Sequence, residues 1–183
     1  MKVYHQLPWH GKNVYFLGFM GSGKSRIGNA FADLLGWPFH DTDDLVERQA
    51  GKSIGDIFAE EGEERFRDLE TSILEQVASW KNNVIALGGG AVLRDINWKL
   101  ITGSGITICL TAPPELLSDR IGRNHHRPLM SNLDEEERLK KINRMLEQRL
   151  PYYQRAQFTF ESKNDRSVSE FVRYIFEQLM EEL

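Results

Sequence analysis

Short runs of apolar residues recur along the chain and alternate with segments whose apolar residues follow a helical period. The runs cover residues 14–17, 38–40, 84–87, 106–110 and 158–160. An alternation of short buried strands with amphipathic helices is typical of a parallel sheet whose strands are joined by crossover helices. The pattern therefore predicts an α/β fold.

Three of the helices can be placed from their apolar stripes. The last stripe lies between residues 168 and 179, and Ser167 with Glu170 forms a capping box before it. A second stripe runs from Phe66 to Trp80, and a third helix begins near Asp134, where acidic residues favour a helix N-terminus. We interpret these stripes as packing faces without a functional role.

Residues 122–133 follow neither period and contain Gly, Asn and Pro, which indicates a long exposed loop. Loops of this length in compact domains are either functional or disordered. Arg123 and Arg127 favour a mobile lid that closes over a ligand. The neighbouring His125 and His126 are expected to be solvated, because no Cys or carboxylate with metal-ligand spacing lies beside them.

Composition limits the classes of protein to which the chain can belong. The 183 residues are 40% hydrophobic and include 10 Phe, 5 Tyr and 4 Trp, enough for one domain with a substantial core over residues 1–183. Residues 1–13 are expected to form an N-terminal extension. The net charge of −4 argues against a general nucleic-acid surface, so any anion site must be local.

The chain contains a single cysteine, Cys109, inside an apolar run, which predicts a buried and unreactive thiol and excludes a disulfide within the chain. Residues 1–13 lack the continuous apolar region of a signal peptide. No run approaches the ~20 apolar residues needed to cross a bilayer. We therefore expect a cytoplasmic protein with no membrane partner.

The strongest motif is G-x-x-x-x-G-K-[ST], which begins at Gly18 between the first apolar run and a helical segment. Glycines allow such a loop to adopt unusual backbone angles and bring N–H groups close to phosphate oxygens. Lys24, expected to be an exposed loop residue, supplies a charge to the β- and γ-phosphates, and the Ser25 hydroxyl can bind Mg²⁺. The motif predicts a nucleotide-binding P-loop.

Many P-loop proteins also carry an aspartate at the end of a later apolar strand, but no such aspartate follows residues 84–87 or 106–110. Asp41 and Asp43, directly after the second run, provide the acidic groups instead. In extended geometry they lie on one side, where one carboxylate could reach the metal and the other a substrate hydroxyl. The alternative is an acidic helix N-terminus without further function.

Taken together, the motifs resemble those of the shikimate kinase family, in the family's order over most of the chain. They are the P-loop at 18–25, Asp41-Thr-Asp43, Phe66-Arg67-Asp-Leu-Glu70, Gly88-Gly-Gly90, Arg127-Pro-Leu129, and Arg149 before Tyr153. The resemblance implies a P-loop NTPase-like three-layer α/β/α fold with a five-stranded parallel sheet and a mobile lid. It also implies transfer of the γ-phosphoryl group of ATP, with Mg²⁺, to the 3-hydroxyl of shikimate.

The resemblance also implies the residues of the nucleotide and metal sites. Arg120 stacks on the adenine, Lys163 begins the segment on the other side of the base, and Arg127 approaches from the lid. Ser25 binds Mg²⁺, and Asp41 holds the water shell of the metal. The phosphates contact the loop and the start of the following helix, at Gly21, Ser22, Gly23, Lys24, Ser25 and Arg26.

On the acceptor side, the resemblance implies that Arg67 and Arg149 grip the carboxylate of shikimate and that Glu70 orients Arg67. Asp43 binds the substrate hydroxyls and is the candidate base, so that Lys24, Asp43 and Arg127 form the catalytic set. The backbone of Gly88, Gly89 and Gly90 approaches the ring.

The residues themselves support part of this assignment and leave alternatives. Arg149 follows Ile142 by seven residues and therefore lies on the apolar face of its helix, where a cation needs an anion. For both arginines the alternative is a structural ion pair, which for Arg67 would involve Glu70 three residues away. The triple glycine could equally be only a tight exit from a strand.

Two other functions compete with this interpretation. One is a different small-molecule P-loop kinase, such as one acting on gluconate, against which Arg67 and the triple glycine argue. The other is a nucleotide-binding sensor without catalysis, which would typically lack Lys24, Asp43 or a lid arginine. We expect a monomer whose partners are ATP and shikimate alone.

Overall fold

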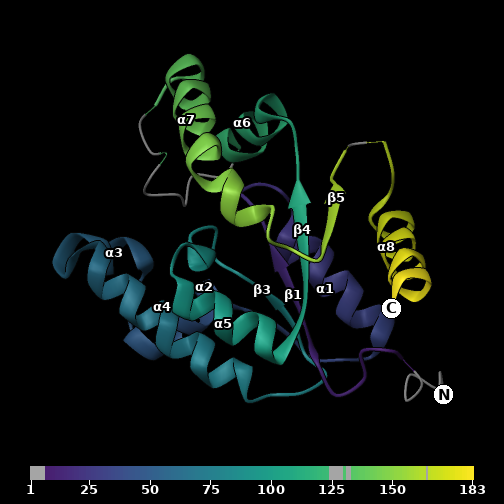
Figure 1. Cartoon of the computed structure of the whole chain (residues 1–183). Helices are drawn as coiled ribbons and strands as arrows, with labels where there is room; N and C mark the ends of the chain where they lie inside the picture. Colours follow the sequence, from purple (N-terminus) through teal and green to yellow (C-terminus); the bar gives the residue numbers. More distant parts are fainter. Residues whose placement is uncertain (1–6, 124–129, 131–132, 164) are drawn as a thin grey trace.

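A computed structural model describes residues 7–123, 130, 133–163 and 165–183 of the chain (Figure 1). Five parallel strands form one sheet in the order β2-β3-β1-β4-β5. Each strand coincides with a predicted apolar run to within one residue at either end, which confirms the predicted sheet. The strands are β1 Asn13–Leu17, β2 Phe39–Asp41, β3 Val84–Ala86, β4 Gly105–Thr111 and β5 Phe158–Glu161.

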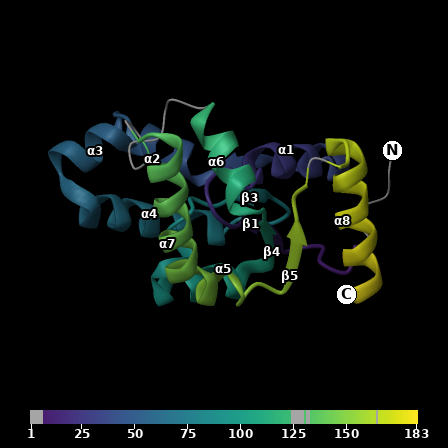
Figure 2. The same cartoon turned by 90° about the horizontal axis from the view of Figure 1, so that it is seen from above.

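The alternating side chains of the central strand divide the core into two layers. Val14 and Phe16 pack with α1 and α8, whereas Tyr15 and Leu17 pack with α4, α5 and α7. Figure 2 shows α1 and α5 on opposite sides of the sheet. This is the three-layer α/β/α arrangement that the sequence predicted. The helices are α1 Lys24–Leu35, α2 Thr42–Ala50, α3 Ile54–Glu60, α4 Gly62–Ala78, α5 Asp95–Ser104, α6 Pro114–Gly122, α7 Glu135–Tyr153 and α8 Val168–Glu182, with a 3-10 turn η2 at Ala91–Leu93.

The three predicted helices are present, and the capping box predicted at Ser167 is confirmed. Asp134 caps α7 and Ser167 caps α8, each in a complete capping box. The helix expected from Phe66 to Trp80 begins earlier, at Gly62, and ends at Ala78. Trp80 therefore lies beyond the helix, where its ring contacts that of His40 at 4.6 Å.

The described part of the N-terminal segment belongs to the core. Leu7 and Trp9 are buried, and the Trp9 ring meets Phe176 of α8 edge to face at 6.0 Å. Cys109 is buried in β4, and burial raises the pKa of its thiol to about 12, in agreement with the predicted unreactive thiol. Over the described ranges, none of the helices combines the length and apolar character that crossing a membrane requires.

The topology brings separate sequence motifs to one edge of the sheet. Because the strands are parallel, their carboxyl ends meet at the same edge, the usual ligand position in open α/β sheets. There β1 leads into the P-loop, β2 into α2 and β3 into the triple glycine. The helices α6 and α7 stand together above this edge in Figure 1.

Candidate active site

The P-loop connects β1 to α1 through glycines in the left-handed region, with φ of +135° at Gly18, +81° at Gly21 and +98° at Gly23. Gly18 is the most restricted, because a Cβ there would lie 2.2 Å from the carbonyl oxygen of Leu110. This oxygen belongs to the backbone, so no flexible side chain could move aside to make room. The loop therefore requires glycine as predicted, and it leads to the N-terminus of α1, where N–H groups and the helix dipole favour a phosphate.

Lys24 is the first residue of α1 and is buried, so the expectation of an exposed loop lysine was wrong. Its Nζ donates hydrogen bonds to the carbonyl oxygens of Gly18 and Phe19, both at 3.0 Å. These carbonyls belong to the loop itself. The lysine charge is consequently held inside the loop that is expected to surround the phosphates.

Asp41 and Asp43 do not share the extended geometry assumed from the sequence, because α2 begins between them at Thr42. Asp41 accepts a hydrogen bond from Ser25 Oγ at 2.5 Å and caps α2 by accepting one from the Asp43 N–H at 3.0 Å. The Asp43 carboxylate instead lies beside Gly88, with Oδ1 2.6 Å from where a Cβ would be. The helix start thus separates the two carboxylates, one toward the P-loop and one toward the triple glycine.

The hydroxyl of Ser25 and the carboxylate of Asp41 are the candidate magnesium ligands. The described residues contain no group of three or more His, Cys, Asp and Glu side chains that could form a metal cage. Mg²⁺ in kinases needs no such cage, since it keeps several waters and takes one or two protein ligands together with phosphate oxygens. Ser25 and Asp41, already in contact with each other beside the P-loop, fit that requirement.

Limited space, rather than backbone conformation, favours glycine in the turn after β3. None of Gly88, Gly89 and Gly90 has a positive φ. A Cβ at Gly90, however, would lie 2.5 Å from Nη1 of Arg67, and one at Gly88 would lie 2.9 Å from Oε1 of Glu70. As the charged side chains are packed here, little room remains for a Cβ at Gly88 or Gly90, which a tight strand exit alone would not explain.

Arg67, on α4, is buried beside this turn and is paired with two acids. Its Nη1 donates to Oε2 of Glu70 at 2.9 Å and its Nη2 to Oε1 of Glu63 at 3.1 Å. The guanidinium also lies 5.1 Å from the centre of the Phe66 ring. The ion pair that the sequence offered as an alternative is therefore present, in addition to the contact with Gly90.

Glu70 is more deeply placed than the sequence suggested, at 1% exposure. Burial raises the pKa of its carboxyl group to about 7, against the opposing effect of Arg67. Its Oε1 has no hydrogen-bond partner among the described residues and lies beside Gly88. Sequence reasoning treated Glu70 only as a support for Arg67, and its spacing from Arg67 carried no sign of the buried oxygen.

Arg149, on α7, reaches the same turn, and no acid among the described residues forms an ion pair with it. Its Nη1 donates to the carbonyl oxygen of Gly89 at 3.2 Å, and its guanidinium lies 5.6 Å from the centre of the Phe19 ring. Within the described part of the chain, no carboxylate forms an ion pair with it. The structural ion pair considered for Arg149 is thus not observed there.

Tyr153 was not selected as a site residue from the sequence, yet its hydroxyl donates to the same Gly89 carbonyl at 2.7 Å. It follows Arg149 by four residues on α7, a spacing that places two side chains on one helix face. That spacing is the sequence feature that could have identified Tyr153 as a neighbour of Arg149 in the site.

The predicted adenine-binding residues lie near the P-loop. Nη1 of Arg120, on α6, donates to the Gly21 carbonyl at 3.2 Å and to Ser162 Oγ at 3.3 Å, and burial lowers the pKa of its guanidinium. Lys163 follows Ser162 and is paired with Glu161 at 2.8 Å. Arg120 and the segment from residue 162 therefore come together beside the loop.

Most of the predicted lid falls outside the described residues. Of residues 122–133, the structure describes only 122, 123, 130 and 133. Arg127, His125 and His126 are among those outside. Their expected roles remain predictions.

Comparisons with known proteins agree with this geometry. The family model described as shikimate kinase matches residues 20–180. A shikimate kinase of Symbiobacterium thermophilum is 43% identical over 92% of this chain and 97% of its own length. The solved structure of a shikimate kinase from Acinetobacter baumannii in complex with shikimate has a TM-score of 0.85 at 34% identity, over 93% of both chains. That from Bacteroides thetaiotaomicron has a TM-score of 0.87 at 34% identity, over 92% of this chain and 98% of its own. With the P-loop, the separated aspartates and two arginines converging on one glycine turn, these matches show that the chain belongs to the shikimate kinase family.

Proposed function

We propose that this protein transfers the γ-phosphoryl group of ATP to the 3-hydroxyl of shikimate, giving shikimate 3-phosphate and ADP for the biosynthesis of aromatic amino acids. The observation that carries the proposal is the convergence of Asp43, Arg67 and Arg149 on the triple glycine at the P-loop edge of the sheet. Such a site combines cations for a carboxylate, an acceptor for hydroxyls and a phosphate-binding loop. Shikimate presents that combination of groups.

On the nucleotide side, we propose that the loop N–H groups and Lys24 bind the phosphates and that Arg120 and Lys163 border the base. Lys24 is held within the loop by two carbonyls, so its charge is already in place before charge develops on the transferring group. Ser25 and Asp41 would hold Mg²⁺, which would neutralise part of the negative charge of the phosphates. Arg127 is proposed to add a further positive charge from the lid.

On the acceptor side, Arg67 and Arg149 bind the carboxylate, and the backbone of Gly88–Gly90 lies against the ring. A guanidinium can hold a carboxylate through two parallel hydrogen bonds, which fixes the orientation of the ring as well as its position. Asp43 then accepts a hydrogen bond from the 3-hydroxyl. As the hydroxyl oxygen bonds to the γ-phosphorus, the bond from that phosphorus to the β,γ-bridging oxygen breaks and ADP leaves, while the hydroxyl proton moves to the Asp43 carboxylate.

An ADP-release assay with shikimate, gluconate and nucleoside monophosphates tests this proposal. Only shikimate is expected to support turnover. Lys24→Met should lower kcat by ~10²-fold or more, the usual effect of removing a preorganised electrostatic group. Because Lys24 is buried and donates to two loop carbonyls, circular dichroism must show that the variant is folded. Turnover of gluconate would favour the other small-molecule kinase, and no turnover with any acceptor would favour the sensor.

The remaining expectations from the sequence are proposed on the same basis. We infer a single domain over residues 1–183, a monomer, and a cytoplasmic location without nucleic-acid partners. The net charge of −4 supports the last point. Size-exclusion chromatography with light scattering at catalytic concentrations measures the oligomeric state, and a dimer would overturn the inference of a monomer.

A further inference from the structure

The triple glycine is the part of the proposed site that most needs external support, because glycine loses more conformational freedom on folding than any other residue. Backbone groups of Gly88 and Gly90 form hydrogen bonds with residues of α2 and of the turn that follows. The Gly88 N–H donates to Thr42 Oγ1 at 2.8 Å, and the carbonyls of Gly88 and Gly90 accept from the N–H groups of Ala91 and Leu93, both at 3.1 Å. The Gly89 carbonyl is held by α7 instead.

Two donors from α7 meet at the Gly89 carbonyl oxygen. The Tyr153 hydroxyl makes the shorter bond, at 2.7 Å, and Nη1 of Arg149 makes the longer one, at 3.2 Å. A carbonyl oxygen has two lone pairs, so these donors use its full capacity. Because the Tyr153 hydroxyl occupies one lone pair of the Gly89 oxygen, Arg149 can donate only one hydrogen bond to that oxygen.

The Tyr153 hydroxyl is a constant donor at this position. It is 4% exposed, and burial raises its pKa to about 12, with the charge of Arg149 opposing the rise. It therefore remains protonated at any working pH. A buried hydroxyl that lost its acceptor would cost about 1–3 kcal/mol, so the bond to Gly89 is strongly maintained.

We propose that Tyr153 is a positioning residue for Arg149: its hydroxyl fixes the Gly89 carbonyl and leaves most of the guanidinium directed at the carboxylate of the acceptor. Without the hydroxyl, the carbonyl can turn toward Arg149 and compete with the incoming carboxylate for the same N–H groups. The proposal rests on the proposed function, since it assigns Tyr153 to carboxylate binding in that site.

Tyr153→Phe removes only the hydroxyl oxygen, and Tyr152→Phe is the matched control. Tyr152 is the neighbouring residue on α7 and packs partly buried against the same core. For Tyr153→Phe we expect KM for shikimate to rise about fivefold to tenfold, the effect of losing one hydrogen bond, with kcat and KM for ATP changed less than about twofold. Tyr152→Phe should leave all three within about twofold.

A double-mutant cycle with Arg149→Lys separates positioning from a general structural effect. If Tyr153 acts through the guanidinium, Tyr153→Phe should change KM for shikimate less than about twofold in the Arg149→Lys background. Additive effects in the two backgrounds, or an unchanged KM in the single variant, would overturn this proposal. A wild-type protein that does not phosphorylate shikimate would reject the proposed function itself, so the two failures are distinguishable.

Discussion

The two arginines of the proposed carboxylate site are equally buried but differ in their surroundings. Arg67 and Arg149 are each 8% exposed, and both contact the glycine turn after β3. Arg67 is paired with two carboxylates, whereas Arg149 is held by a neutral carbonyl and the face of an aromatic ring. The charge of Arg67 is thus balanced by paired acids. Among the described residues, no acid forms an ion pair with Arg149.

The difference divides structural and binding roles between chemically identical side chains. Removing a buried cation that has an acidic partner destabilises the fold, because the partner is left buried and unpaired. A buried cation without such a partner carries a desolvation cost that no paired acid offsets, and it attracts an anionic ligand. We expect Arg67 to combine both roles and Arg149 to act mainly in binding.

Arg67→Ala is expected to have the largest total effect, because it damages both stability and binding. At pH 8, above the Glu70 pKa of about 7, it leaves an ionised carboxylate at 1% exposure without its cation, and breaking a buried pair in this way typically costs ~3–5 kcal/mol. Affinity for shikimate should also fall about tenfold to a hundredfold. Urea denaturation and calorimetric titration measure the two effects, and a stability loss below ~1 kcal/mol would remove the distinction between the arginines.

Arg149→Ala should weaken shikimate binding by a similar factor, about tenfold to a hundredfold, but change the free energy of unfolding by less than ~1 kcal/mol. ATP affinity should change little. Arg149→Lys should restore binding only in part, because lysine cannot form the paired hydrogen bonds of a guanidinium. Calorimetric titration of shikimate and of ATP provides the measurement. If shikimate affinity survives, Arg149 is not a carboxylate ligand.

Most of the fold was predictable because it depends on local patterns. Buried strands give apolar runs, and the capping boxes of α7 and α8 are legible as short motifs. The start of α2 was harder to predict from the sequence, because Asp41 both ends β2 and caps the helix. That single residue changed the expected relation between Asp41 and Asp43.

The sequence predicted that Asp43, Arg67 and Arg149 lie near the triple glycine, as the structure shows, but it did not predict how these side chains pair. A pattern of residues shows that Arg67 has an acid three positions away, but only tertiary packing shows that Glu70 is buried with an unpartnered oxygen at Gly88. The contact between Tyr153 and Gly89 likewise joins residues 64 positions apart in the sequence. Long-range contacts of this kind leave no periodic signal.

Glu70→Gln should alter how stability depends on pH. The folded protein holds a proton on Glu70 up to a pKa of about 7, against an ordinary value of 4.5, so it binds more protons than the unfolded chain between these values. Stability from this group is therefore fully present below pH 4.5 and is lost as the pH rises through 7. The wild type should lose about 2 kcal/mol relative to Glu70→Gln between pH 5 and pH 7.5.

Urea denaturation of the two proteins across that range, without ligands, measures the difference. The groups that act on Glu70 are Arg67, Asp43 and Arg149, and all three are retained in the variant. Parallel pH profiles for the two proteins would show that Arg67 compensates the carboxylate fully. The contrast between the arginines would then be larger than proposed.

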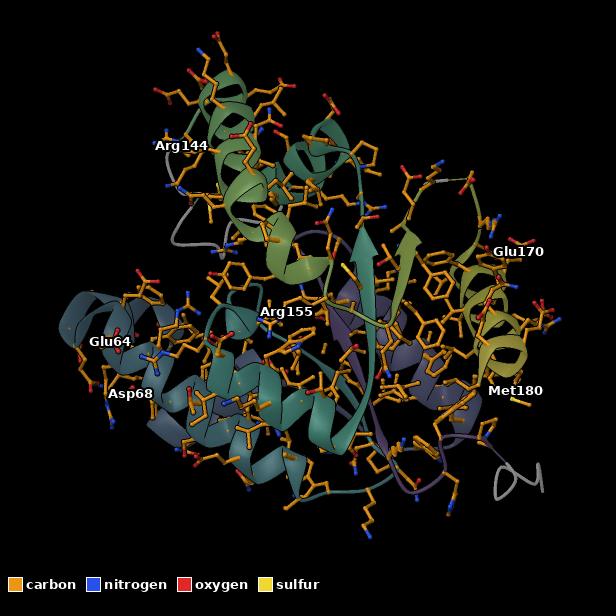
Figure 3. All side chains as sticks on the ribbon, in the orientation of Figure 1. Glu64, Asp68, Arg144, Arg155, Glu170 and Met180 are labelled. Atoms are coloured by element: carbon orange, nitrogen blue, oxygen red, sulfur yellow. The ribbon has the colours of Figure 1, made fainter. Side chains whose placement is uncertain are left out.

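Arg94→Ala should have the smallest effect on stability of the four substitutions. It tests whether the structural role of Arg67 depends on the burial of its acidic partner or only on the number of its acidic partners. Arg94 also pairs with two acids of α4, Asp68 at 2.9 Å and Glu64, both labelled in Figure 3. These acids are 58% and 85% exposed, so water already solvates them when the arginine is removed. Exposed pairs contribute ~0–1 kcal/mol, and we expect a loss in that range with KM for shikimate unchanged. If urea denaturation gave a loss as large as that of Arg67→Ala, the number of acidic partners rather than their burial would account for the behaviour of Arg67.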